Sequence, residues 1–225
     1  MTGESGQPGS REGGIPLEVA SPLRTPGAAA VAGIVFAVLL GTAVVLLKTS
    51  VPASPGEWLT QPGRRDTVSV ALQLVPFAGI AFLWFVGVVR DRMGAGEDRF
   101  FATVFLGSGL VFVATVFVAA AVAGGLLATA SGQGADGAAA LALGRGATSA
   151  LLNVYAMRMA AVFTFSAVIL GRGTGVIARW LRLAGIASAV LLLIGNGISG
   201  WVILLFPAWV LAVSISILAE GRAAR

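Results

Sequence analysis

The chain of 225 residues contains no cysteine and no histidine. These two absences exclude disulfides, thiolate chemistry, zinc sites with nitrogen or sulfur ligands, His-ligated haem and His-based acid–base catalysis. Charge is also scarce, because Asp, Glu, Lys and Arg make up 11% of the residues, whereas a soluble domain carries about 25%. Most of the surface is therefore expected not to face water.

The acidic residues are few and lie outside the apolar stretches, so a cluster of carboxylates inside the apolar part of the protein is not expected. No pairing of a nucleophile with a base is recognisable either. We therefore expect no metal, no cofactor and no enzymatic activity. The acids fall in tails and connections: Glu4, Glu12, Glu18, Glu57, Asp66, Asp91, Glu97, Asp98, Asp136 and Glu220.

Long apolar stretches dominate what is present, since 57% of the residues are hydrophobic. About 20 apolar residues in a helix cross the ~30 Å hydrocarbon layer of a bilayer. The uncharged stretch after Arg182 is too long for one span, and the cluster Gly195-Asn196-Gly197 suits a turn that divides it. A re-entrant loop is the rival interpretation of the fifth span. The predicted fold is an all-α, polytopic membrane protein with six transmembrane helices at 28–47, 68–89, 100–130, 147–170, 177–195 and 199–219.

The spans define the domain organisation. Residues 1–26 are rich in Gly, Pro and Ser and are predicted to be a disordered cytoplasmic tail. Residues 27–219 form the six-helix membrane domain, in which 131–146 is expected to be a flexible connection, and 220–225 form a second cytoplasmic tail.

The distribution of Lys and Arg predicts the orientation. Basic residues concentrate on the cytoplasmic side of a membrane, which places both termini in the cytoplasm, most simply in a cell (inner) membrane of bacterial type. The predicted inner group is Arg11, Arg24, Arg90, Arg92, Arg99, Arg172, Arg179, Arg182, Arg222 and Arg225, and the outer group is Lys48, Arg64, Arg65 and Arg145.

Arg158 is the one charge predicted inside a span. It lies eleven residues from one end of 147–170 and twelve from the other, where an uncompensated Arg costs about 2.5–3.5 kcal/mol on insertion scales. Two interpretations stay open. Arg158 is structural and bonds free carbonyls and lipid phosphate, or it binds an anionic ligand or a lipid headgroup.

Other polar groups share the expected depth of Arg158. The side chain of Arg158 leans toward Tyr155 on its own helix, while Gln73 lies in the second span and Asn196 at the turn. Asn153 is about 140° around the helix and faces other neighbours. Pro76 and Pro207 each free a carbonyl one turn earlier. These features predict an outward-facing, ligand-binding polar pocket between spans two, four and six, formed by Arg158, Tyr155, Gln73 and Asn196.

The connection after the second span reads G-x-x-x-D-R-x-G at residues 87–94. It resembles the loop 2–3 motif of major facilitator transporters, in which the Asp and Arg lock the helices in one state. The resemblance would give Asp91 and Arg92 the role of a latch and would make the chain a dimerising half-transporter. The family continues with basic residues where this chain has Ala95 and Gly96, and a charged turn that obeys the positive-inside rule also explains the segment.

Most of the chain also resembles uncharacterised six-span membrane proteins of actinobacterial type, in residues 98–110 and 155–161 and in its Ala, Gly, Val and Arg bias. That resemblance implies no activity. The expected partners are the lipid bilayer, a lipid or small anionic ligand, and a second copy or a membrane protein that this chain would serve as an accessory subunit. Nucleic acid is not expected, because the basic residues form no patch.

Overall fold

The computed structural model describes residues 26–51, 61–93, 99–129, 135–174, 177–195 and 199–223. Within these residues the chain is helical and has no strand, which confirms the all-α class. The predicted tail at 1–26 lies almost entirely outside the described residues. The elements are α1 (Pro26–Ser50), α3 (Pro62–Met93), α4 (Arg99–Thr129), α5 (Ala135–Ala150), the π-helical turn η1 (Leu151–Ala156), α6 (Met157–Thr174), α7 (Arg179–Ile194), the 3-10 turn η3 (Val202–Leu204) and α8 (Leu205–Ala223).

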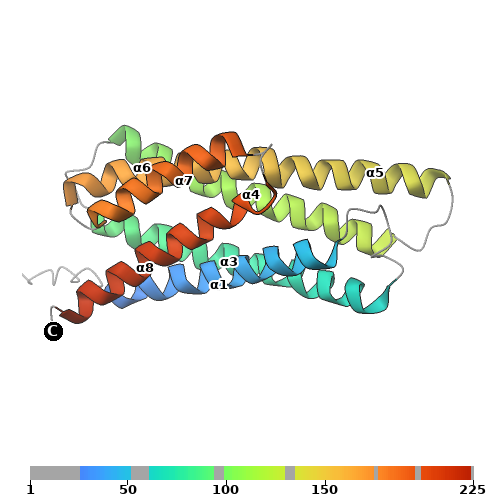
Figure 1. The fold of residues 1–225 in the computed structure, drawn as a ribbon, viewed down its shortest axis with the longest axis horizontal. Coiled ribbons are helices and arrows are strands. Elements are labelled where there is room, and N and C mark those ends of the chain that lie inside the picture. Colours follow the sequence, from blue (N-terminus) through green and yellow to red (C-terminus); the bar gives the residue numbers. More distant parts are fainter. Residues whose placement is uncertain are drawn as a thin grey trace, which may run out of the picture.

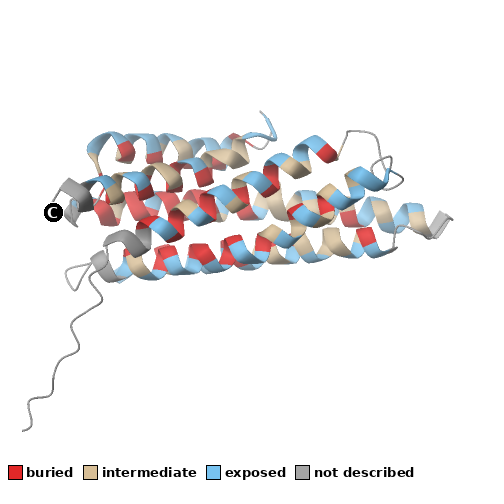
Figure 2. Cartoon of the chain, turned by 90° about the horizontal axis from the view of Figure 1, so that it is seen from below, coloured by how far each residue is buried: buried red, intermediate tan, exposed pale blue. Residues whose placement is uncertain are grey.

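The helices follow from the lack of water in a bilayer, where backbone N–H and C=O groups must bond one another within the same segment. Hydroxyl side chains obey the same rule, since Thr115 donates to the Val111 carbonyl at 2.7 Å and Ser214 to the Val210 carbonyl at 2.8 Å. Large apolar side chains such as Phe77 and Trp84 remain exposed, and Figure 2 shows exposed positions along the helices of the bundle. Such a surface suits lipid.

Among the residues that the structure describes, five helical segments are long and apolar enough to cross a membrane, not the six that the sequence predicts. The missing one is α7, whose 16 residues extend about 24 Å and fall short of the ~30 Å hydrocarbon layer. It begins at Arg179 and ends at Ile194, directly before the glycine cluster. In Figure 1, α7 and α8 form a hairpin that turns back near the middle of the long axis. The five are Ala30–Ser50, Pro62–Arg90, Arg99–Ala128, Gly137–Arg172 and Val202–Ala219.

Helix α5 occupies the segment that the sequence assigned to a flexible connection, so that prediction is wrong from residue 135 onward. Alanine has the highest helix propensity, and α5 packs closely on α4. A Cβ at Gly144 would lie 2.5 Å from the Leu126 side chain. Helices α5, η1 and α6 follow one another without a break and together reach about 60 Å. The chain's last helix also continues to Ala223, beyond the predicted start of the tail at residue 220.

The bundle is antiparallel. α1 packs on α3 and α8, α4 packs on α3, α5 and α6, and α7 lies against α6 and α8. Gly185 permits the last of these contacts, because a Cβ there would lie 2.7 Å from both the Trp209 Nε1 and the Val168 side chain. The same Trp209 Nε1 donates to the Leu181 carbonyl at 3.1 Å. This bond fixes α8 against α7.

Five buried phenylalanine rings form the centre of the core, one each from α1, α3, α4, α6 and α8. Ring centroids lie 4.7 Å apart for Phe36 and Phe82, 5.0 Å for Phe82 and Phe163, and 4.8 Å for Phe112 and Phe206. Aromatic pairs at such distances stabilise by about 0.5–1.5 kcal/mol beyond burial. We call these five residues the phenylalanine core.

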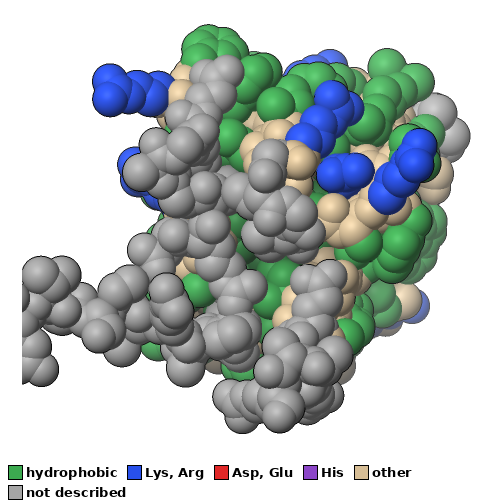
Figure 3. Space-filling model, turned by 90° about the vertical axis from the view of Figure 1, so that its left-hand side faces the viewer, with side chains coloured by type: hydrophobic (Ala, Val, Ile, Leu, Met, Phe, Trp, Pro, Cys, Tyr) green, Lys and Arg blue, Asp and Glu red, His purple; other side chains and the backbone are tan. Residues whose placement is uncertain are grey.

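The described chain begins and ends at the same end of the bundle (Figure 1). That end carries Arg90, Arg99, Arg172, Arg179 and Arg182 at the termini of α3, α4, α6 and α7. Figure 3 looks at it and shows Lys and Arg side chains standing among hydrophobic ones. Lys48, Arg64, Arg65 and Arg145 belong to the opposite half.

The phenylalanine core gives a test of the packing. Phe82 is 0% exposed and Phe77, on the same helix, is 63% exposed. Replacing Phe82 with Ala leaves a cavity where helices meet, and we expect a loss of about 3 kcal/mol. Thermal unfolding in mild detergent, followed by tryptophan fluorescence, measures the change. Phe77→Ala is the control and should unfold like the wild type, whereas equal losses in both variants would contradict the core.

Candidate functional site

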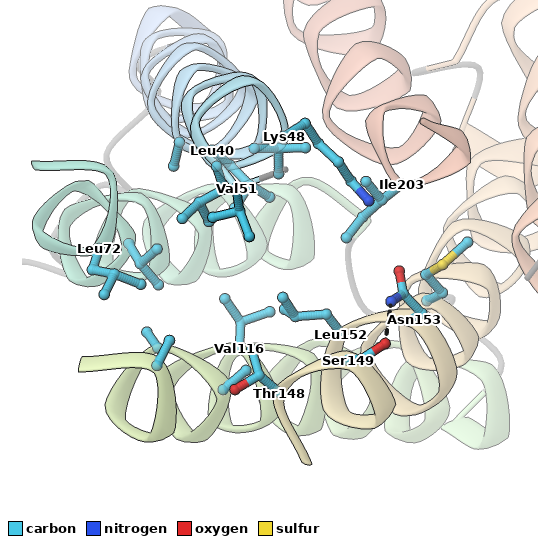
Figure 4. A pocket seen from close by; sticks show the side chains of 18 of the residues that line it. Leu40, Lys48, Val51, Leu72, Val116, Thr148, Ser149, Leu152, Asn153 and Ile203 are labelled. Carbon is cyan, nitrogen blue, oxygen red and sulfur yellow. Dashed lines mark hydrogen bonds between the residues drawn. The ribbon is translucent and has the colours of Figure 1, made fainter. Parts of the chain in front are cut away.

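A cavity of about 420 Å³ lies beside the turn of the α7–α8 hairpin (Figure 4). Its back wall comes from α3 and α4 and is apolar throughout. Below, toward the phenylalanine core, Phe112, Phe206, Met157 and Leu192 close it. The back wall consists of Val68, Leu72, Val75, Phe112, Val116, Ala119, Ala120, Ala123 and Leu126.

The polar lining comes only from α1, α5 and η1. Lys48 projects from α1, and Arg145, Thr148 and Ser149 project from α5, with Asn153 following on η1. Helices α1 and α5 are not among the helix pairs that pack closely. We call the space between them, above the α7–α8 turn, the α1–α5 gap. Polar groups therefore gather at the gap, and apolar groups line the depth of the cavity.

Two cations face this cavity, and none of its lining residues is an acid. Within the part of the chain that the structure describes, the Arg145 Nη1 and the Thr148 Oγ1 are buried without a hydrogen-bond partner. A buried polar group without a partner is unfavourable, and a charged one more so. The arrangement is suited to an anion that accepts from both groups.

The turn of the hairpin makes room for the ammonium group of Lys48. A Cβ at Gly200 would lie 2.5 Å from the Lys48 Nζ, so only glycine fits here without a shift of the lysine. In Figure 4, Lys48 extends past Ile203 toward the side of the cavity where Asn153 lies, and Asn153 donates to the Ser149 Oγ at 3.1 Å. Groups from α1, α5 and η1 thus converge on one space.

The π-helical turn η1 decides which side chains enter the cavity. The Met157 N–H donates to the Leu152 carbonyl, five residues back, and such turns often occur at functional sites. Asn153 on this turn lines the cavity, whereas Arg158 one turn later is exposed on the outside. The predicted separation of Asn153 from Arg158 is confirmed.

Arg158 lies in a second, shallow groove of about 320 Å³ that Tyr155 also lines, with Val111 and Thr115 from α4. Its Nη1 donates to the Val154 carbonyl at 3.0 Å, a backbone group within the π turn. The structure thus brings Arg158 and Tyr155 together. It leaves Gln73 exposed on α3, lining neither hollow, and Asn196 lies outside the described residues. Ligand binding by these four residues stays a prediction.

Asp91 and Arg92 lie in the last turn of α3, which continues to Met93. Their side chains lie outside the described residues, so the latch stays a prediction. The same holds for the half-transporter and for the accessory subunit.

For Lys48 and Arg145 the sequence predicts only that they lie on the outer side of the membrane. One signal was present, since Lys48 occupies the last turn of an apolar helix. The sequence does not predict that this helix lies near α5, because it predicts a connection and no helix at 131–146.

Comparisons with known proteins do not assign the chain to a family. No family model, curated protein or solved structure matches the chain. Among the described residues, no three His, Cys, Asp or Glu side chains are grouped as metal ligands. The site must therefore be interpreted from its own geometry.

The bond from Arg158 to Val154 predicts a small effect of removing this charge. Arg158→Leu loses a charge-assisted hydrogen bond of about 1.5–3 kcal/mol and is relieved of an insertion cost of about 2.5–3.5 kcal/mol. The two nearly cancel, so we expect the unfolding midpoint in detergent to stay within a few degrees of the wild type. A loss as large as that of Phe82→Ala would instead show that Arg158 supports the fold.

Proposed function

We propose that this multi-pass membrane protein binds an amphipathic anion in the cavity beside the α7–α8 turn. One observation carries the proposal: two cations, Lys48 from α1 and Arg145 from α5, line the same cavity as an apolar wall from α3 and α4. The site differs from the pocket that the sequence predicts around Arg158, although the expected kind of ligand, a lipid or small anion, is the same.

The lining restricts the chemistry of the ligand. A purely apolar molecule would leave Lys48 and the buried Arg145 Nη1 without a partner, and a simple inorganic anion would leave the α3–α4 wall without contacts. Arg and Lys form charge-assisted hydrogen bonds to carboxylate and phosphate. A volume of about 420 Å³ lies within the range of small-molecule sites, about 300–1,000 Å³. An anion with a hydrocarbon chain satisfies both sides.

The hairpin turn also supports a site with access to polar surroundings. Non-helical backbone at membrane depth is tolerated where it lines a cavity or meets water. Leu192 before the turn and Ile203 after it both line this cavity. Polar backbone groups of the turn and the polar side chains of the α1–α5 gap thus lie in the same region.

The proposed orientation has both termini in the cytoplasm of a cell membrane and the cavity toward the outer side. The basic helix ends near the chain termini favour it through the positive-inside rule. Although α7 is short, it runs antiparallel to α6 and α8, which returns the chain to the end where it began (Figure 1). In this orientation α7 returns the chain to the inner side without counting as a sixth full span.

Charge removal at the cavity tests the proposed function. With octyl phosphate as the probe, Lys48→Met and Arg145→Met should each weaken binding about tenfold or more, since tenfold corresponds to about 1.4 kcal/mol, the scale of one charge-assisted bond. Calorimetry of the purified protein in mild neutral detergent gives the dissociation constants, and native mass spectrometry gives the stoichiometry.

Two variants serve as controls. Arg64→Met removes a charge from the same half of the bundle without touching the cavity lining, and Arg158→Leu removes the charge from the outer groove. Both should bind octyl phosphate like the wild type. If binding depends on Arg158 and not on Lys48 or Arg145, the ligand binds in the outer groove and the proposed site is wrong.

A further inference from the structure

The cavity has an open side, and the lengths of the helices explain it. Helices α1, α3, α4 and α5 pack in that order, each on the next, and form an arc. The α7–α8 hairpin closes the arc between α1 and α6 and turns back near the middle of the bundle, while α5 and the start of α3 continue past it (Figure 1). Close packing between α1 and α5 does not complete the arc on the remaining side.

The polarity changes in order from this gap inward. Lys48 and Ser149 flank the gap and are exposed. Next come the buried Nη1 of Arg145 and the buried Oγ1 of Thr148. The α3–α4 wall behind them is apolar, and Phe112 and Phe206 at the base are nearly inaccessible. A bound amphiphile would therefore hold its head at the gap and its chain against the wall.

The donors at the gap fit a phosphate monoester better than a carboxylate. A phosphate monoester carries about −1.5 to −2 charges at pH 7 and three strong acceptor oxygens, and it meets two cations here. The guanidinium fork of Arg145 can bond two of the oxygens, and the hydroxyls of Thr148 and Ser149 can donate to the same group. A carboxylate has one charge and two oxygens and would leave donors unused.

The gap opens to the side of the bundle, which is the direction of the lipid. The two helices that border it carry exposed large apolar side chains, Val45 on α1 and Leu143 on α5. A hydrocarbon chain that moves sideways through the gap stays in apolar surroundings throughout, whereas a route through water would expose the whole chain. The membrane itself is thus the nearest source of a ligand.

From this geometry we propose that the ligand is a membrane lipid with a phosphate monoester headgroup that enters sideways through the α1–α5 gap. The headgroup lies between Lys48 and Arg145, and one chain lies along the α3–α4 wall. The inference rests on the proposed function and adds to it the headgroup and the source.

Photocrosslinking in a bilayer tests it. Full-length protein is placed in phosphatidylcholine vesicles that contain a few per cent phosphatidic acid with a photoreactive group on its chain. Mass spectrometry of the labelled peptides then compares two faces of α4. Phe112 and Val116 line the cavity, whereas Leu110 and Val118 are 49% and 51% exposed and line neither hollow.

We expect label on Phe112 and Val116 from the phosphatidic acid, falling tenfold or more in Lys48→Met and Arg145→Met and unchanged in Arg64→Met. Label on Leu110 and Val118 comes from bulk lipid and should be the same in all variants, which also shows that each variant is folded and inserted. A lipid with the same photoreactive chain and a choline headgroup should label the wall at least tenfold less.

Three outcomes would overturn the inference, and the first two leave the proposed function standing. Wall label that is equal for the choline lipid would remove the monoester headgroup. Phosphatidic acid that labels only the outside, while octyl phosphate still binds in a Lys48- and Arg145-dependent way, would make water the source. If inorganic phosphate, added as a competitor, reduces the labelling of Phe112 and Val116 as strongly as octyl phosphate does, free phosphate is the ligand. If octyl phosphate binding itself ignores Lys48 and Arg145, the proposed function fails as well.

Discussion

The contact of five phenylalanine rings at one level of the bundle is the constraint on which the rest of the structure depends. Phe36, Phe82, Phe112, Phe163 and Phe206 come from five helices, and each ring touches others of the group. Between helices in lipid, close packing and not exclusion of water holds the helices together. Phe206 brings α8 into this group just after the hairpin turn. Below that level the bundle is filled, and above it the side chains of α3 and α4 face a cavity.

The cavity follows from a mismatch of helix lengths. Helices α3 and α4, with 32 and 31 residues, continue well past the end of α7, which has 16. Because the helices differ in length in this way, one side of the bundle is left uncovered where the short α7–α8 hairpin turns back. The two helices that border the uncovered side, α1 and α5, carry every charged group of the lining. Length and polarity thus agree on where a polar headgroup would be held.

Arg158 differs from Lys48 and Arg145 in how its charge is accommodated in this apolar protein. Arg158 has a bond to the Val154 carbonyl of the π turn and is open to the outside. Arg145 has a buried nitrogen with no partner among the described residues. A buried donor without a partner, as in Arg145, therefore indicates a ligand site better than a charge in the middle of an apolar stretch, as in Arg158. The unpaired donor is the group to which a ligand can bind.

The sequence by itself determined the class of the protein, since long uncharged stretches in a chain with 11% charged residues leave helices in lipid as the stable form. It also indicated the break near Gly195, because Gly195-Asn196-Gly197 lies within an uncharged stretch that is too long for one span. It could not determine that α7 is too short to count as a span or that 135–150 is helical, since the packing of α5 on α4 through Gly144 is a contact between helices. Nor could it group Lys48 with Arg145. Only the tertiary structure decided that pairing, because the lengths of other helices, and not any local pattern, leave these two residues at the sides of one gap.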